Sequence, residues 1–540
     1  MSERQRSHWG WGFTDRFPDD ERRRLLALQI GGLLGIPAPP LRPLPDAAAA
    51  RIPEPRLAPP AGLAHLARAD RATRMAHTFG RGYRDLVRGF RGAFSPAPDW
   101  VAFPANEADV KDVLAWASAE GVAAIPWGGG TSVVRGVEAE VGPRFGGAVS
   151  IDLGKMDRVL EVDSISRSAR IQAGARGPVL EEQLAAHGLS LRHYPQSFEL
   201  STLGGWIVTR AGGHFATLYT HIDDLVQSVR MVTPAGELVT RRLPASGAGP
   251  APERLVLGSE GTLGVVTEAW MRVFPRPRWR ASASVRFARF DDGVAAARAV
   301  AQAGLYPANC RLLDPLECLL HSVPADGGAM LLLAFESADH PLEPWLGRAV
   351  ELAVAAGGVL ADAPKYRDDG ALTAGGAREG AGGSWRRSFL DAPYLQTALV
   401  SLGVVVDTFE TACTWDRFPA LHQAVGEAVR AAMQTACGGG VLSCRFTHVY
   451  PDGPAPYYTF IAPGRAGEEE AQWQVIKDAA CAALVDHGAT ITHHHAVGRE
   501  HRLGYERERA PLFAEVLRAA KRTLDPAGVL NPGVLLSEDP

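Results

Sequence analysis

The sequence predicts an α+β protein with more than one domain, and three observations lead to this fold class. Strand-like runs alternate with short helical patterns between residues 101 and 275, whereas longer helical patterns separated by strand-like pieces follow between residues 277 and 490. The chain has 540 residues, which exceeds what one hydrophobic core usually organises. Its hydrophobic content of 46% is enough to fill two or three cores, so two or three domains are expected.

Residues 1–95 predict an extension rather than a separate domain. The chain opens on an aromatic cluster at residues 9–13 and continues into a stretch rich in proline and alanine at residues 37–60. Because proline restricts the backbone to extended conformations, this stretch is expected to run along a surface of the protein.

A predicted helix and strand lead into the most informative motif of the chain. Asn106 can cap a helix, and Asp109 follows three residues later. Gly121 ends this helix, whose buried face is expected to consist of Val110, Val113, Leu114 and Ala117. The apolar residues 122–125 then predict a short buried strand that opens into a glycine-rich loop.

The glycine-rich loop predicts a binding site for an anion. Without Cβ atoms, Gly128, Gly129 and Gly130 reach positive φ and let successive backbone N–H groups converge on phosphate oxygens. The P-loop motif needs a lysine after its spacer, and the dinucleotide fingerprint needs a helix directly on its third glycine, so neither fits this loop. A nucleotide-binding loop of another kind is expected, and an ordinary turn is the alternative.

The remaining elements follow from the same periodic patterns. Strands are predicted at residues 156–162 and 169–173, and helices at residues 178–187, 293–304, 344–356 and 424–436. The glycine-rich segment at residues 368–383 has no apolar period and predicts a mobile loop. A lid over a site and an ordinary surface insertion are both compatible with it.

Composition excludes several classes of function. A net charge of −4 without a basic stripe argues against nucleic-acid binding. Six cysteines without a C-x-x-C pair disfavour a zinc site or a disulfide framework. Without a signal-peptide pattern or an apolar run near ~20 residues, the protein is expected to be cytoplasmic, with peripheral contact on the inner face of the membrane as a second location. Lysine occurs only at positions 111, 155, 365, 477 and 521, an arginine bias that favours a GC-rich bacterial source.

Four further segments carry a resemblance to a known superfamily. Residues 197–206, 209–213, 258–268 and 524–533 resemble, in this order, the FAD-binding proteins of the vanillyl-alcohol oxidase and p-cresol methylhydroxylase (PCMH) superfamily. The resemblance implies a two-lobed PCMH-type FAD-binding domain plus a smaller α+β cap domain that holds the substrate. The expected domains are an N-terminal extension at 1–95, the FAD-binding domain at 96–276, the cap at 277–495, and a C-terminal segment at 496–540 that returns to complete the flavin site.

A closer resemblance is to the alkyl-dihydroxyacetonephosphate synthase family, and it covers almost the whole chain. Its specific motifs are residues 415–417, Trp-Asp-Arg, and the triplet at residues 493–495, three consecutive histidines. It implies an enzyme of ether-lipid synthesis that exchanges the acyl group of acyl-dihydroxyacetone phosphate for a fatty alcohol without net redox change. Oxidised flavin would serve as the electron sink. These two lipids are the expected partners, and a homodimer is expected because related enzymes commonly dimerise.

The resemblance also implies which residues hold FAD. Members with covalent flavin commonly carry a histidine in the glycine-rich loop, whereas this chain has Thr131, so FAD is expected to be non-covalent. Backbone amides are expected to make most of the contacts. The expected FAD-binding residues are Pro126, Trp127, Gly128, Gly129, Gly130, Thr131, Ser132, Gln196, Ser197, Phe198, Glu199, Leu200, Ser201, Thr202, Thr209, Arg210, Ala211, Gly212, Glu260, Gly261, Thr262, Leu263, Gly264, Val265, Val266 and Asn531.

Four residues are expected to carry the chemistry. Tyr457 matches the family's proposed acid/base, and with a reference pKa near ~10 it needs nearby positive charge to act near neutrality. His493, His494 and His495 are expected to supply charge or hydrogen bonds. If residues 489–495 are extended, His493 and His495 share one face and His494 lies on the other. A metal site is the competing interpretation, but two histidines on one face without a nearby carboxylate do not complete one, so no metal is predicted.

The substrate phosphate is expected to bind arginine, whose planar fork of donors matches it. Arg417 is the first choice and Arg311 the second, because both match positions implicated in the family, while Arg445 is a weaker choice by adjacency. Two positions depart from the family. Gln196 stands where the synthases carry an aspartate beside the flavin, and Gly212 stands in place of a serine. The lost carboxylate changes charge and proton handling near the flavin, which leaves a different substrate open.

Two other classes of function stay open. A D-2-hydroxyacid dehydrogenase or an alcohol oxidase on the same fold would use the histidines as base and an arginine as carboxylate clamp. A flavoprotein that binds lipids or partners without catalysis is the third class, and the intact Tyr457, Arg417 and histidine positions argue against it. A hydroxy acid that bleaches the flavin by itself would distinguish the oxidoreductase from the transferase.

Overall fold

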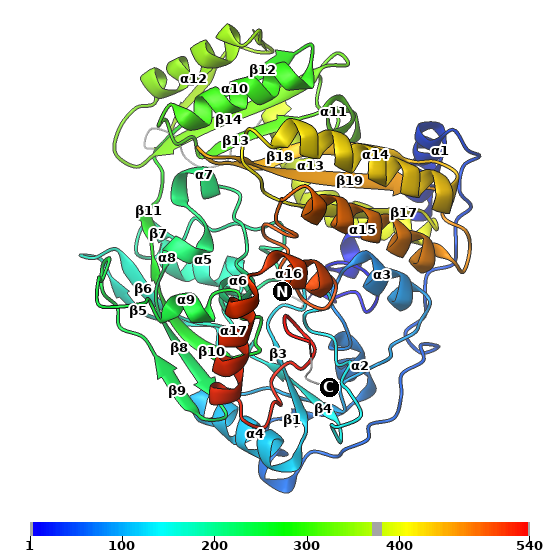
Figure 1. Cartoon of the computed structure of the whole chain (residues 1–540), viewed down its shortest axis with the longest axis vertical. Coiled ribbons are helices and arrows are strands. Elements are labelled where there is room, and N and C mark those ends of the chain that lie inside the picture. The colour runs from blue at the N-terminus through cyan, green and yellow to red at the C-terminus, as the bar shows by residue number, and fades with distance from the viewer. Residues whose placement is uncertain (1–3, 370–380, 538–540) are drawn as a thin grey trace.

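The computed structural model describes residues 4–369 and 381–537, with the backbone alone for residues 381–390. Two parts lie one above the other in Figure 1, with three smaller sheets in the lower part and one large sheet in the upper part. We call the lower part the N-terminal region (residues 67–275) and the upper part the cap (residues 276–495). The segment at residues 368–383, predicted as a mobile loop, lies mostly outside the described residues.

The first sheet of the N-terminal region delivers the glycine-rich loop. Its strands lie in the order β1 (Ala67–Arg68), β2 (Trp100–Ala102), β4 (Ala148–Asp152) and β3 (Ala123–Trp127). The predicted helix is confirmed as α4 (Glu107–Glu120). The Asn106 side chain accepts a hydrogen bond from the Asp109 N–H at 3.1 Å, and Gly121 closes the helix in the left-handed conformation. All four residues of the predicted apolar face are buried, which fixes how α4 feeds the chain into β3.

The second sheet is antiparallel, with strands in the order β5 (Val159–Asp163), β6 (Ser168–Gln172), β10 (Val265–Arg272), β8 (Val226–Thr233) and β9 (Gly236–Val239). β5 begins later than predicted because the Met156 N–H first closes a turn on the Leu153 carbonyl. β7 (Leu189–Ser190) pairs with β11 (Phe274–Pro275). The helices of this region are α2 (Arg71–Ala76), α3 (Tyr83–Phe90), α5 (Gly177–Ala185), α6 (Leu203–Thr209), α7 (Ala216–Tyr219), α8 (Ile222–Leu225) and α9 (Glu253–Val256).

The C-terminal segment returns to the first sheet. After α16 (Arg502–Glu508) and α17 (Pro511–Leu524), Leu530 forms a parallel bridge with Ala124 of β3. The Ala124 N–H donates to the Val529 carbonyl at 2.8 Å, and the Asn531 N–H donates to the Ala124 carbonyl at 2.9 Å. Figure 1 shows this red segment running down across the N-terminal region.

The cap is built on one large antiparallel sheet. Its strand order is β15 (Val359–Leu360), β12 (Trp279–Phe287), β14 (Ala329–Ser337), β13 (Asn309–Leu313), β18 (Val441–Val449), β19 (Pro454–Ala462) and β17 (Val405–Glu410), with β16 (Lys365–Asp368) also on β12. The predicted helices appear as α10 (Phe290–Gln302), α12 (Glu343–Ala355) and α14 (Phe418–Cys437). α14 begins earlier than predicted because Pro419 occupies its first turn. The other cap helices are α11 (Pro315–Leu320), α13 (Ala381–Ser401) and α15 (Glu469–Asp486).

The N-terminal extension packs against both parts. Its short helices η1 (Thr14–Arg16) and η2 (Ala61–Leu63) flank α1 (Asp20–Leu34), and Ala27 and Ile30 of α1 enter the same hydrophobic core as Val405 of the cap. The Trp9 ring meets the Phe90 ring edge to face at 5.1 Å between centroids. Among the described helices, none is both long and apolar enough to span a bilayer.

Candidate functional site

A cavity of about 320 Å³ lies between the N-terminal region and the cap. One wall consists of the glycine-rich loop, residues near 194–214 and residues near 260–266. The other wall consists of cap strands and α13. Residues that the sequence predicted for a cofactor and for catalysis therefore meet in one place, which makes this cavity the candidate site.

The glycine-rich loop lines the cavity over its whole length, residues 126–132. A Cβ atom on Gly129 would lie 2.0 Å from the Leu200 carbonyl oxygen, and one on Gly128 would lie 2.3 Å from Thr202 Oγ1. The loop packs directly on residues 200–202 because it has no side chains there, and this leaves its backbone toward the cavity. Such a concave, backbone-lined surface fits the pyrophosphate of FAD.

The other predicted FAD residues divide into two groups. Those that line the cavity are Gln196, Ser197, Ser201, Thr202, Thr209, Ala211, Gly212, Glu260, Gly261, Gly264, Val265 and Val266. Within the described part of the chain, the wall does not include Phe198, Glu199, Leu200, Arg210, Thr262, Leu263 or Asn531.

Asn531 of the second group and the carboxylate of Glu260, which lines the cavity, connect this wall to the C-terminal segment. Asn531 donates through Nδ2 to the carbonyls of Gly136 (2.9 Å) and Glu260 (2.7 Å). The Glu260 carboxylate accepts from the Val497 N–H (2.9 Å) and from the Gly498 N–H (2.8 Å). Burial raises the pKa of Glu260 to about 7. These bonds attach the C-terminal segment to the cavity wall that contains the glycine-rich loop.

A row of paired residues across the cap sheet sets the opposite wall. Tyr457 on β19 lies directly across from Glu410 on β17 and from Arg445 on β18. Because directly opposed residues point to the same face of a sheet, these three side chains face the cavity side together. Arg445 is also opposite Leu313 of β13, which places Arg311, two residues away on that strand, on the same face.

Arg311 and Arg445 form a buried pair of cations on the cavity wall. Burial and the neighbouring Arg445 lower the pKa of Arg311 to about 9. On its other side, Arg445 donates through Nη1 to the buried Glu317 carboxylate at 2.9 Å, and Glu317 also accepts from Ser443 Oγ at 2.6 Å. Two guanidinium groups on one wall attract a dianion such as a phosphate ester.

Tyr457 lies in the centre of this wall, and it is 5% exposed. Its hydroxyl donates to Thr408 Oγ1 at 2.9 Å, and the Arg445 guanidinium lies 3.8 Å from the centre of its ring. Burial raises the pKa of Tyr457, and Arg445 opposes this effect only in part. Tyr457 therefore stays a neutral phenol near neutral pH.

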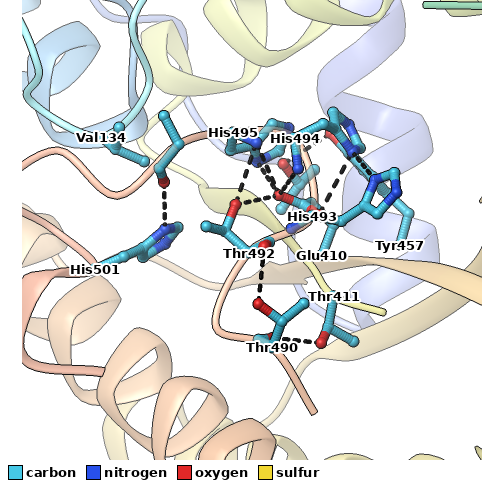
Figure 2. A network of polar contacts seen from close by, with 12 residues as sticks. Val134, Glu410, Thr411, Tyr457, Thr490, Thr492, His493, His494, His495 and His501 are labelled. Atoms are coloured by element: carbon cyan, nitrogen blue, oxygen red, sulfur yellow. Dashed lines mark hydrogen bonds and ion pairs between the residues drawn. The ribbon is translucent and has the colours of Figure 1, made fainter. Parts of the chain in front are cut away.

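Residues 489–495 do not form a strand, so the alternation of faces that an extended segment would give does not apply to the three histidines. The segment turns around the Glu410 carboxylate, which Figure 2 places at the centre of the contacts. Glu410 accepts from Thr492 Oγ1 (2.6 Å) and from the N–H groups of His493 (2.6 Å), His494 (3.1 Å) and His495 (2.9 Å). His494 and His495 consequently both line the cavity, whereas His493 lies behind them.

The three histidines are neutral in the folded protein. Burial lowers the pKa of His493 and of His494 to about 3 and that of His495 to about 4. Burial alone would raise the pKa of Glu410, but its contacts with the histidine segment, including the hydrogen bond from the Thr492 hydroxyl, hold it below its usual range. A buried carboxylate thus faces neutral imidazoles, with Glu410 Oε2 3.4 Å from His494 Nδ1.

One nitrogen each of His448, His493 and His494 lies within 4.8 Å of the others, a spacing that a metal ion can bridge. Hydrogen bonds engage both nitrogens of His493. Nε2 lies 2.8 Å from the Tyr450 hydroxyl, and Nδ1 lies 3.0 Å from His494 Nδ1. We therefore assign no metal to this cluster.

Arg417, the first choice for the phosphate, lies away from the cavity. It precedes α14, and its Nη1 donates to the Gly488 carbonyl at 3.3 Å in an exposed position. In the described structure the cavity wall does not include it. The position of Arg417 supports a role at the start of α14, and the phosphate interpretation passes to Arg311 and Arg445.

Sequence reasoning missed several residues of the cavity wall. Trp11 and Arg81 come from the N-terminal side of the predicted FAD-binding domain, and Lys477 comes from α15. His448 follows a register shift in β18 that lies between Phe446 and His448, so a simple alternation would misplace it. Arg6 also reaches the glycine-rich loop, donating to the Gly129 carbonyl at 3.0 Å.

The two departures from the family pattern both lie at the wall. Gln196 lines the cavity. A Cβ atom on Gly212 would lie 3.1 Å from His448 Nε2 and 3.1 Å from His494 Cβ. The glycine therefore lets these two histidines approach the chain more closely than a serine would.

Polarity changes along the cavity. Tyr457, Thr459 and Ile461 line it in succession because alternate residues of β19 share one face. Near Ile461 the wall is completed by Val406 and by Leu395 and Leu399 of α13. The cavity thus runs from a cationic, histidine-rich end to an apolar end.

Comparisons with known proteins agree with this architecture. Residues 98–241 match the FAD binding domain model, and residues 276–535 match the C-terminal domain of FAD linked oxidases. Alkyldihydroxyacetonephosphate synthase of Dictyostelium discoideum is 32% identical over 484 residues, which cover 86% of this chain and 78% of that protein. The synthase of Caenorhabditis elegans is 31% identical, with 86% and 80% coverage.

More distant relatives share the fold. An uncharacterized FAD-linked oxidoreductase of Mycobacterium tuberculosis is 29% identical, with 82% of this chain and 91% of that protein covered. A solved structure of alkyldihydroxyacetonephosphate synthase superposes with a TM-score of 0.81 at 26% identity, covering 98% of both chains. With the glycine-rich loop, the cap sheet and the returning C-terminal segment all in place, this chain belongs to the FAD-dependent alkyldihydroxyacetonephosphate synthase family.

Proposed function

We propose that this protein is an FAD-dependent alkyldihydroxyacetonephosphate synthase. It would exchange the acyl group of acyl-dihydroxyacetone phosphate for a fatty alcohol in ether-lipid synthesis, without net redox change. The polarity of the cavity carries the proposal, since two arginines and a histidine cluster occupy one end and aliphatic side chains occupy the other. A substrate with a dianionic head and a long alkyl chain matches both ends.

Four residues of the cap would then divide the work of binding and proton donation. The guanidinium groups of Arg311 and Arg445 would bind the phosphate, with Glu317 holding Arg445 in place. When bound along the glycine-rich loop, FAD would supply an electron sink for the exchange. Tyr457 would donate a hydrogen bond or a proton rather than remove one, because burial raises its pKa. The apolar end would hold the alkyl chains and exclude water.

We also propose that FAD is bound non-covalently by the predicted residues. The domain boundaries predicted from the sequence are part of this proposal. Thr131 in place of a histidine supports dissociable flavin. Peripheral membrane contact is supported by Leu25 and Leu28, which are 57% and 64% exposed on α1. The homodimer is supported only by the family, and the cytoplasmic location and bacterial source only by the composition of the chain.

The test is an anaerobic incubation of the purified holoprotein with palmitoyl-dihydroxyacetone phosphate and isotopically labelled hexadecanol. We expect labelled ether product by mass spectrometry and no lasting loss of oxidised flavin absorbance. Tyr457→Phe should form much less product while it retains FAD. An unreactive lipid pair, together with flavin that D-2-hydroxy acids bleach, would contradict the proposal and identify an oxidoreductase.

A further inference from the structure

A chain of hydrogen bonds leads from the cavity toward the surface behind the histidine triplet. His494 lines the cavity, and its Nδ1 lies 3.0 Å from Nδ1 of His493. His493 Nε2 lies 2.8 Å from the hydroxyl of Tyr450. Tyr450 is partly exposed at the end of β18, and the next two residues, Pro451 and Asp452, are exposed. The three groups therefore form a continuous path from the cavity wall to a partly exposed residue beside the exposed turn at Pro451 and Asp452.

We propose that His494, His493 and Tyr450 form a proton relay that carries the proton removed beside the substrate ketone out of the cavity. This inference rests on the proposed function, because that exchange reaction requires removal of such a proton. His494 would touch the substrate and act as a catalytic residue. His493 and Tyr450 would act through it.

The relay works by a shift of tautomers. In the resting state His494 carries its proton on Nδ1, where the Glu410 carboxylate lies 3.4 Å away, and His493 carries its proton on Nε2 and donates to Tyr450. His494 Nε2 takes the substrate proton, and the electron pair of the broken C–H bond stays on the substrate, delocalised into its carbonyl. His494 Nδ1–H passes to His493 Nδ1, His493 Nε2–H passes to Tyr450, and the hydroxyl proton of Tyr450 passes to water. One proton leaves the substrate and one reaches solvent, so charge and atoms balance.

Burial explains why the proton removed from the substrate cannot simply remain on one histidine. It lowers the pKa of His494 to about 3, so an imidazolium in this position is strongly disfavoured. In the relay every ring gives up one proton as it receives another, and no ring has to stay charged. Burial raises the pKa of Tyr450, so its hydroxyl also transmits a proton without persisting as a phenolate.

Glu410 is the positioning residue of the relay. Its carboxylate accepts from the N–H groups of His493, His494 and His495 and thereby sets the turn that brings the two Nδ1 atoms together. Tyr457 is not part of this path, because its hydroxyl donates to Thr408 Oγ1. The relay therefore assigns proton removal and proton donation to different groups.

The test compares Tyr450→Phe with a matched control, Tyr458→Phe. Tyr458 also bonds to a histidine, with its hydroxyl 3.1 Å from His422 Nδ1, but the described cavity wall includes neither residue. Each holoenzyme is incubated in D₂O with palmitoyl-dihydroxyacetone phosphate and hexadecanol. Deuterium incorporated beside the ketone and ether product are both measured by mass spectrometry.

If Tyr450→Phe interrupts the relay, the removed proton cannot exchange with solvent and returns to the carbon that it left. A positioned proton-transfer group contributes about a hundredfold or more, so we expect the ratio of deuterium incorporation to ether formation to fall at least about tenfold in Tyr450→Phe. Tyr458→Phe should keep the ratio of the wild type. An unchanged ratio in Tyr450→Phe would overturn the relay, since a merely structural defect lowers both quantities together.

A second measurement does not depend on turnover. In holoenzyme labelled with ¹⁵N-histidine, Tyr450→Phe should shift the imidazole resonances of His493 and His494, whereas Tyr458→Phe should shift only those of His422. Absence of ether product from the wild type would contradict the proposed function, and these resonances would still decide the relay. Unshifted signals of His493 and His494 in Tyr450→Phe would overturn it.

Discussion

Replacing Glu410 with alanine is expected to destabilise the protein by about 5 kcal/mol. The replacement removes the acceptor of the N–H groups of His493, His494 and His495 and of the Thr492 hydroxyl. The His495 N–H also donates to Thr492 Oγ1 at 3.1 Å and keeps this acceptor. A buried donor left without a partner costs about 1–3 kcal/mol, so the other three donors together cost roughly 3–9 kcal/mol, and the expected value lies within this range.

Glu410→Gln should cost less, about 2 kcal/mol. Three of the four bonds reach Oε1, so an amide oxygen placed there keeps them. Only the His493 N–H, which donates to Oε2, would then face the amide NH₂ group. Glutamine has the size of glutamate, so the cost of Glu410→Gln relative to the wild type measures the lost Oε2 acceptor and not the size of the side chain.

Urea unfolding of the holoprotein, followed by circular dichroism and by flavin fluorescence, provides the free energies of unfolding. Glu427→Ala is the matched control, because Glu427 is exposed on α14 and its carboxylate accepts a hydrogen bond from the exposed Gln423 side chain at 2.9 Å. It should change the free energy of unfolding by less than about 0.5 kcal/mol. The reasoning fails if Glu410→Ala costs less than about 1.5 kcal/mol, or if Glu410→Gln costs as much as Glu410→Ala.

Three further outcomes are expected. Gly129→Ala should purify without FAD, because its Cβ would lie 2.0 Å from the Leu200 carbonyl oxygen. The control Gly146→Ala should keep full flavin absorbance, because its Cβ would meet no atom within 4 Å. Purification of Gly146→Ala without FAD would contradict the packing argument. Arg311→Met and Arg445→Met should each raise the KM for acyl-dihydroxyacetone phosphate roughly tenfold or more at unchanged FAD content. Arg417→Met should leave this KM unchanged. A KM raised by Arg417→Met but not by the other two variants would restore the phosphate role of Arg417. Burial lowers the pKa of His193 to about 3, so between about pH 6.5 and pH 3 the unfolded chain binds a proton that the folded protein does not, and stability falls on acidification. His193→Phe should make this fall less steep by about 1.4 kcal/mol per pH unit in urea melts, and an unchanged slope would show that His193 titrates normally.

The cavity wall that contains the glycine-rich loop was predictable, because the residues that determine its shape are close together in the sequence. Three glycines in a row fix how close the backbone can come to Leu200, and a capped helix with a buried apolar face fixes the strand that precedes them. Such features depend on residues that are close in the sequence. The resemblance then supplied the cap, whose strands have no comparable local signature.

The geometry of the histidine triplet was not predictable, because it depends on a residue more than eighty positions earlier. An alternating pattern was the natural expectation for residues 489–495, but Glu410 draws three successive N–H groups to one carboxylate and turns the segment. The register shift before His448 likewise comes from the pairing of β18 with β19 and leaves no mark in the sequence. Arg417 was chosen for its motif, yet no pattern in the sequence indicates that its side chain turns toward the Gly488 carbonyl.

The return of the C-terminal segment to β3 has a consequence for biosynthesis. The strand that opens into the glycine-rich loop is completed by Leu530, and the carbonyl of Glu260 is held by Asn531. While the ribosome is still adding these residues, the cavity wall that contains the glycine-rich loop lacks one of its supports. We therefore expect nascent chains to acquire FAD only after residue 531 has emerged, so that flavin bound to this protein marks chains that extend beyond this residue.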